Sequence, residues 1–200
     1  MPFISNGTTI LDNGAFQASL GSMVLLSEQT ASSSASISFT TGIDSTYPIY
    51  KFEFINIHPA TDGAEFKFNL STDGGSNYNV TKTTTHFYTF HTEDDAVASL
   101  NYDSGRDLAQ STAFQNLTGD TGNNNDQSLS GSLEIFNPSS TTFVKHFLAN
   151  TNSYYSSDSS YNSYVAGYGN TTSAIDAIKF QMSSGNIDSG TIKLYGIKDS

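Results

Sequence analysis

Residues 50–54 read Tyr50-Lys51-Phe52-Glu53-Phe54. Successive side chains of an extended strand point to opposite faces, so the three rings share one face and the two charged groups share the other. The segment therefore predicts a strand with one face in a core and one face in solvent. Residues 64–70 repeat this alternation, and Thr61-Asp62-Gly63 between the two segments has the composition of a tight turn. We predict a hairpin over residues 50–70.

The same alternation recurs in two further pairs of segments. Residues 129–135 and 143–148 flank the turn-forming residues Asn137–Ser140, and residues 178–182 and 192–195 flank a glycine-rich connection. Each pair predicts another hairpin. Shorter segments with strand character lie at 23–27, 35–39, 86–91 and 164–168. Together these segments give about ten short strands, which is typical of a sandwich or barrel.

Four regions do not show this alternation. Residues 94–100 and 107–117 mix Ala, Leu and Gln with Ser, Thr and Asn, so each predicts a short helix or an edge strand. Residues 119–128 and 151–162 are rich in Asn, Ser, Asp or Tyr and predict long surface loops.

Length and composition indicate one domain with a real core. The 200 residues fit a single sandwich domain at 21–200 preceded by a short extended arm at 1–20. Only 14% of residues are charged, and the 14 Phe and 11 Tyr provide the bulk that a disordered chain lacks. A polar, uncharged and aromatic composition favours an all-β fold.

Charge and cysteine content exclude several classes of protein. The formal net charge of -11 would repel the phosphate backbone, so we expect no nucleic-acid partner. No segment approaches the roughly 18 apolar residues of a membrane span, so we expect no membrane partner. The chain has no Cys, which excludes disulfides, thiolate metal ligands and a cysteine nucleophile.

The C-terminal segment Ser189–Lys198, which reads SGTIKLYGIK, resembles the closing strand of jelly-roll domains in structural proteins of tailed bacteriophages, marine ones especially. Residues 54–62, 137–146 and 171–176 are similar to segments of one such marine phage family, so the resemblance spans roughly 21–198. It implies a jelly-roll-like antiparallel β-sandwich and a place in the virion. It brings no catalytic residues.

On this resemblance we expect a non-enzymatic virion structural protein, and we favour a capsid decoration or cement protein that stabilises the shell through inter-subunit contacts. The expected partners are other virion proteins, either the major capsid protein or tail proteins, together with further copies of this chain in a homotrimer. In that assembly a neighbouring chain would bury the apolar residues of the arm, which are Phe3, Ile10, Leu11 and Phe16.

The alternative hypothesis is a tail or fibre module that binds a host glycan or surface receptor. Its candidate site is the tyrosine-rich segment with Tyr154, Tyr155, Tyr161 and Tyr164, together with residues 119–128. Tyr, Ser and Asn are the residue types of adaptable binding surfaces. The same rings also suit packing against the sandwich edge or against a sister subunit.

The segment Asp120–Asp126 is a candidate calcium loop. Asp120, Asn124 and Asp126 offer hard oxygen ligands, although the segment lacks the Glu that closes an EF-hand loop, and Asn-Gly-Asp clusters are foremost turn formers. A third hypothesis is therefore a calcium-dependent carbohydrate-binding module. The sequence shows no nucleophile elbow, P-loop, dinucleotide fingerprint or HExxH motif, so we expect no enzyme and, calcium apart, no cofactor.

Overall fold

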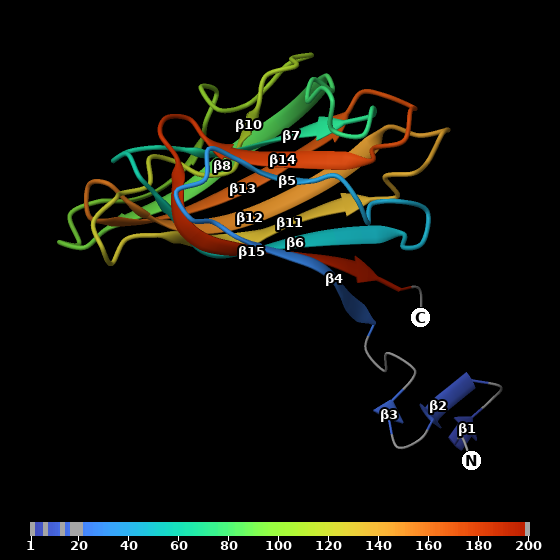
Figure 1. The fold of residues 1–200 in the computed structure, drawn as a ribbon. Helices are drawn as coiled ribbons and strands as arrows, with labels where there is room; N and C mark the ends of the chain where they lie inside the picture. Colours follow the sequence, from blue (N-terminus) through green and yellow to red (C-terminus); the bar gives the residue numbers. More distant parts are fainter. Residues whose placement is uncertain (1–2, 6–7, 13–14, 17–21, 199–200) are drawn as a thin grey trace.

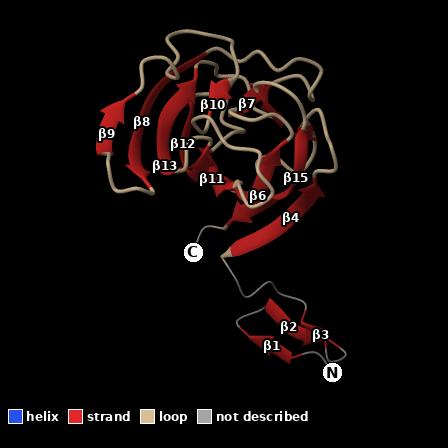
Figure 2. Ribbon diagram, turned by 90° about the vertical axis from the view of Figure 1, so that its left-hand side faces the viewer, coloured by secondary structure: helices blue, strands red, loops and turns tan. Residues whose placement is uncertain are grey.

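The structure is a computed structural model that describes residues 3–5, 8–12, 15–16 and 22–198. Every helix or strand assigned to these residues is a β-strand, and two antiparallel sheets face each other as the layers of a sandwich (Figures 1 and 2). The predicted all-β antiparallel sandwich is confirmed. Within the described residues, no helix has the length and apolarity needed to cross a membrane.

The two layers differ in size. In spatial order, the larger sheet contains β4 (Met23–Thr30), β15 (Ile187–Ile197), β6 (Ile49–Pro59), β11 (Leu129–Phe136), β12 (Lys145–Tyr155), β13 (Ser159–Gly169), β8 (Lys82–Thr92) and β9 (Ala98–Tyr102). The smaller sheet contains β10 (Gln115–Asn116), β7 (Phe66–Ser71), β14 (Ala177–Met182) and β5 (Ile37–Phe39). A separate sheet of β1 (Phe3–Ser5), β2 (Thr8–Asp12) and β3 (Ala15–Phe16) stands apart from the sandwich in both views.

Phenylalanine rings from both sheets form the centre of the core. The Phe180 ring lies 5.3 Å from the Phe52 ring and 5.3 Å from the Phe54 ring, measured between centroids. It also stacks on Phe66 at 5.6 Å. All four side chains are almost completely buried, and burying one such ring stabilises the fold by roughly 1.5–3 kcal/mol.

Two of the three predicted hairpins are wrong. β6 and β7 belong to different sheets, and so do β14 and β15, so both connections lead the chain from one layer to the other. The Phe54 and Phe66 rings therefore meet across the interior, with centroids 5.2 Å apart, instead of lying side by side on one sheet. Alternation gives each strand an apolar face. Two strands with such faces can be neighbours in one sheet or can face each other from two sheets, and the pattern is the same in both cases.

The hairpin predicted around Asn137 is confirmed, because β11 and β12 pair antiparallel. The prediction of a surface loop at 151–162 is wrong, since β12 continues to Tyr155 and pairs with β13 along its whole length. The helix alternatives at 94–100 and 107–117 are also wrong, and the strands β9 and β10 occur there. Thr151 and Ser153 are buried on the inner face of β12, so the alternation exists but uses polar residues.

A long connection covers the part of the larger sheet that the smaller sheet leaves open. The backbone N–H of Lys82 on β8 donates to the carbonyl of Ser111, and the Thr84 hydroxyl donates to the Gln115 side-chain oxygen at 2.6 Å. On β12, the Thr151 hydroxyl donates to the carbonyl of Leu117. The connection from Asp103 to Ser128 therefore lies over the inner faces of β8 and β12 and leaves their outer faces open.

Candidate functional site

The densest group of charged side chains surrounds Arg106, the one arginine of the chain. Its guanidinium donates to Glu65 Oε1, to Asp103 Oδ2 and to Asp120 Oδ1, each at 2.7 Å. One cation thus faces three carboxylates, and the planar guanidinium has enough donors for all of them. We call Arg106 and these three carboxylates the Arg106 cluster.

The Arg106 cluster lowers the pKa of two of its acids, Asp103 and Glu65. Burial alone would raise the pKa of Asp103, but hydrogen bonding to Arg106 and its positive charge hold that pKa below the usual value. The pKa of Glu65 is also lowered, because Lys67 and Arg106 outweigh the effect of burial. Close cationic partners within the fold therefore offset most of this negative charge.

Two of the tyrosines proposed as receptor contacts, Tyr155 and Tyr161, contact the Arg106 cluster. The Tyr155 hydroxyl donates to Asp120 Oδ2 at 2.9 Å, and burial together with this contact raises its pKa to about 12. The Tyr161 ring is buried and stacks between Tyr155 and Tyr88, at centroid distances of 5.2 and 4.5 Å. These contacts tie the covering connection to the β12–β13 hairpin, so the cluster acts as a structural clamp.

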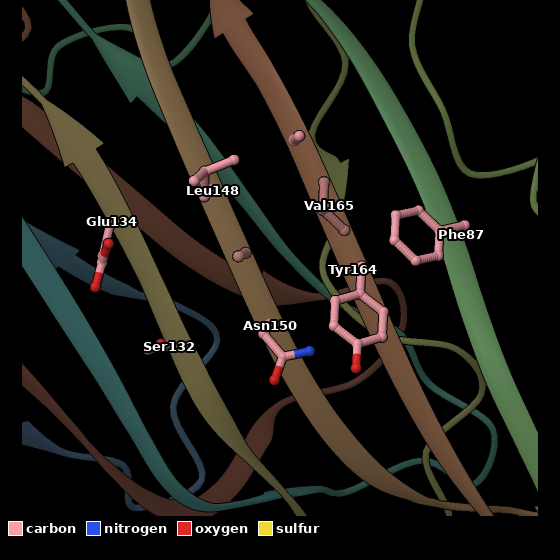
Figure 3. A pocket seen from close by; sticks show the side chains of 9 residues that line it. Phe87, Ser132, Glu134, Leu148, Asn150, Tyr164 and Val165 are labelled. Atoms are coloured by element: carbon pink, nitrogen blue, oxygen red, sulfur yellow. The ribbon is translucent and has the colours of Figure 1, made fainter.

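The outer face of the larger sheet carries an open site beside a stacked pair of aromatic rings. Phe87 on β8 and Tyr164 on β13 are directly opposite each other, and their rings stack at 4.9 Å with an 11° angle between planes. The two residues are 40% and 39% exposed. Next to Tyr164, a groove of about 380 Å³ runs over β12, as Figure 3 shows. We call it the outer groove.

The outer groove has an apolar wall and a polar wall. Tyr164 on β13 lies on the apolar side, and Ser132 and Glu134 on β11 supply the polar side, while the exposed Leu148 and Asn150 lie between them on β12 (Figure 3). Tyr164, Asn150 and Ser132 lie in one row across neighbouring strands, and Ala166, Leu148 and Glu134 lie in the next row. Rigid paired strands therefore fix the positions of the groove's side chains.

A second depression of about 380 Å³ continues the outer groove toward the other end of β12. Leu148 and Ala166 line both hollows, and the extension adds Phe136, His146 and Tyr168. The His146 and Tyr168 rings meet edge to face at 6.1 Å. The combined surface is an elongated channel with aromatic groups along its length.

The opposite end of the larger sheet offers a different surface. Among the described strands, β4 pairs with β15 on one side only and so forms an edge of the sheet. Its Met23 and Leu25 are 41% and 50% exposed, although both are large and apolar. An eight-residue edge strand with apolar side chains is a template for pairing with another chain.

The remaining predicted tyrosines lie on the outer face. Tyr154 is half-buried on β12, donates its hydroxyl to Asp158 at 3.2 Å and lines a polar depression that also includes His91 and Asp126. Tyr164 belongs to the outer groove. The four predicted tyrosines therefore do not form one site, because alternation sends Tyr161 to the inner face and Tyr164 to the outer face.

Two of the three candidate calcium ligands, Asp120 and Asn124, have hydrogen-bond partners within the fold. Both carboxylate oxygens of Asp120 are already hydrogen-bonded, to Arg106 and to Tyr155. The backbone carbonyl of Asn124 accepts from Gln127 and lies 3.2 Å from His58 Nε2, whereas Asp126 is exposed. In the part of the chain that the structure describes, no three His, Asp or Glu side chains are grouped as metal ligands. Calcium binding here stays a prediction.

The predicted arm lies at the limit of the described chain. The backbones of Phe3, Ile10, Leu11 and Phe16 belong to β1, β2 and β3, which pair with one another. Their side chains lie outside the described part, so their burial by a neighbouring chain stays a prediction.

Sequence reasoning missed Phe87, Leu148 and Asn150. The available signal was the alternation of the segments at 86–91 and 143–148. In each segment an apolar residue, Phe87 or Leu148, falls on the solvent face. Comparisons of this chain with protein families, with curated proteins and with solved structures find no match.

Proposed function

We propose that this protein is a non-enzymatic structural protein of a tailed-phage particle, and that it decorates and stabilises the capsid. The sequence resemblance supports a place in the virion. The observation that carries the mode of attachment is the free edge of β4, where Met23 and Leu25 expose apolar surface directly after the N-terminal segment.

An edge strand provides attachment in two ways. Its unpaired backbone groups accept a strand from a partner, and its side chains add apolar burial. The major capsid protein is the partner we propose for this edge, with further copies of this chain completing a trimer. A durable interface of this kind buries on the order of 2,000 Å² or more in total.

A substitution at each end of the larger sheet tests this proposal. Leu25→Asp places a charge on the β4 edge, and Leu100→Asp places the same charge on β9, the opposite edge strand, where Leu100 is also exposed. We expect Leu25→Asp and a variant lacking residues 1–16 to fold but to fail to decorate capsids, while Leu100→Asp decorates normally. Equal decoration by all variants would overturn the attachment proposal.

The second candidate function is a tail or fibre module that binds a host glycan or receptor. The exposed aromatic pair Phe87 and Tyr164 beside the outer groove favours it. Quantitative mass spectrometry of purified particles separates the two functions, because a decoration protein is present at hundreds of copies and a tail protein at a few or tens.

A further inference from the structure

We infer that the outer groove is a binding site for a neutral oligosaccharide. This inference goes beyond the proposed attachment, because the groove lies over β11, β12 and β13, whereas β4 is separated from β11 by β15 and β6. A decoration protein and a tail protein would both present this surface.

The apolar wall suits one face of a sugar ring. The C–H groups on a pyranose face need a flat, rigid aromatic surface, and Tyr164 provides one that is held in place by stacking on Phe87. Ala166 beside Tyr164 leaves room over the strand backbone, and the exposed Leu148 side chain adds apolar contact. The groove volume of about 380 Å³ falls within the roughly 300–1,000 Å³ range of small-molecule sites.

The polar wall consists mainly of hydrogen-bond acceptors, which suits hydroxyl donors. Asn150 Nδ2 donates to the carbonyl of Ser163 at 3.1 Å and to Asn162 Oδ1 at 3.4 Å. These bonds turn the nitrogen toward β13 and leave Oδ1 as an acceptor (Figure 3). Glu134 adds two carboxylate oxygens and takes part in none of the ion pairs among the described residues. Sugar hydroxyls supply the donors that this wall requires.

The electrostatics select against acidic glycans. Among the described residues, Glu134 and the Tyr164 phenol are the ionisable side chains that line the groove, and the whole chain carries a formal net charge of -11. A sialylated or phosphorylated sugar would be repelled, so charge complementarity assigns a neutral ligand.

The length of the channel indicates more than one sugar unit. Tyr164 and Tyr168 lie four residues apart on one face of β13, a separation of roughly 13 Å along a strand. The extension lined by His146 and Tyr168 joins the groove at Leu148 and Ala166. A linear oligosaccharide thus contacts Tyr164 at one end and Tyr168 at the other.

The test uses the purified full-length chain, so it does not depend on particle attachment. Binding is measured on an array of matched neutral and sialylated oligosaccharides, and hits are quantified by calorimetry with the same free oligosaccharide. We expect neutral glycans to bind, and we expect Tyr164→Ala and Glu134→Ala each to weaken binding by about tenfold or more. Phe143→Ala is the matched control, because Phe143 is an exposed ring outside the groove, and it should bind like the unmodified chain.

Thermal unfolding of each variant confirms that the variant is folded. Glu134→Ala keeps the inference testable if Tyr164→Ala unfolds. The inference is overturned if no neutral glycan binds, if acidic glycans bind better, or if neither groove variant weakens binding. It is also overturned if the groove proves to be covered by a second copy of the chain, which Tyr164→Ala would reveal as a loss of oligomer in sedimentation. None of these outcomes changes the result of the capsid-decoration test.

Discussion

The ammonium group of Lys82 and the side-chain amide of Asn69 meet in the interior, where Lys82 Nζ donates to Asn69 Oδ1 at 2.5 Å. A second bond runs from Nζ to the carbonyl of Val80 at 2.9 Å. Lys82 is fully buried, and none of the ion pairs among the described residues includes it. Burial without a counter-ion lowers the pKa of Lys82 from 10.5 to about 7.

The lowered pKa of Lys82 predicts that stability rises with pH above neutrality. Between pH 7 and 10.5, the unfolded chain keeps the lysine proton and the folded chain has lost it, so the free energy of unfolding increases with pH. We expect a gain of about 2–3 kcal/mol from pH 7 to pH 9, measured by urea unfolding. In Lys82→Met this gain should disappear, and the variant should be at least as stable as the unmodified chain at pH 6.

Lys198→Met provides the control, because Lys198 is exposed. It should keep the full rise in stability between pH 7 and pH 9. If Lys82→Met shows the same rise as Lys198→Met, then Lys82 is not the group responsible.

The Arg106 cluster predicts a large loss of stability on removal of its single cation. Arg106→Met leaves Glu65, Asp103 and Asp120 close together without the guanidinium that neutralises them. The guanidinium is partly buried and pairs with three carboxylates, so its removal should cost about 2–3 kcal/mol, and urea unfolding at pH 7 measures this cost. Lys67→Met removes a cation of similar exposure that pairs with Glu65 alone, and should therefore cost less, about 1 kcal/mol. Equal losses in the two variants would contradict the clamp.

The fold class was predictable because alternation is local. Each apolar face at 50–54, 64–70 and 178–182 indicates a strand and identifies its buried side. Pairing was not predictable from the same pattern, because Phe54 contacts Phe66 across two sheets and nothing in either segment distinguishes that contact from a hairpin. The continuation of β12 into residues 151–155 was also missed, since its buried positions there include Thr151 and Ser153.

The candidate site was less predictable than the fold, because it depends on the assembly of non-adjacent strands. Phe87, Tyr164 and Asn150 are far apart in the sequence and form one row only after β8, β13 and β12 pair in register. The tyrosine-rich composition pointed to the correct hairpin but not to the correct face. The strand period assigns Tyr161 and Tyr164 to opposite faces once the segment is recognised as a strand.

His86 predicts a loss of stability in mild acid. Its ring is fully buried on the inner face of β8, and neither ring nitrogen has a hydrogen-bond partner among the described residues. Burial lowers the pKa of His86 below 6.5, so below that pH the unfolded chain gains a proton that the folded chain does not. The free energy of unfolding should fall as pH falls from 6.5 to 5, by at most ~1.4 kcal/mol per pH unit.

His86→Leu removes this acid sensitivity, because leucine has no titratable group. Urea unfolding at pH 7, 6 and 5 should therefore give a flatter profile for this variant. His91→Leu changes an exposed histidine of the same strand and should leave the profile as it is. A flat profile for the unmodified chain over this range would refute the assignment to His86.

We predict that the bulge between β15 and β6 requires glycine at position 190, because a Cβ there would clash with the backbone of β6. Its φ is +114°, and a Cβ there would lie 2.5 Å from the carbonyl oxygen of Asn56 and 2.7 Å from the Cα of Ile57. Both contacts are with the backbone of β6, which cannot move without breaking its pairing with β15. We expect Gly190→Ala to lower the free energy of unfolding by about 2–4 kcal/mol.

Gly74→Ala separates backbone strain from the steric clash. Gly74 also has a positive φ, +67°, but a Cβ there would meet no atom within 4 Å. This variant should therefore lose only about 1–2 kcal/mol, the cost of the left-handed conformation itself. The difference between the two variants in urea unfolding measures the close approach of β15 to β6. If the two losses are equal, only the positive φ matters, and the packing of these two strands tolerates a methyl group at position 190.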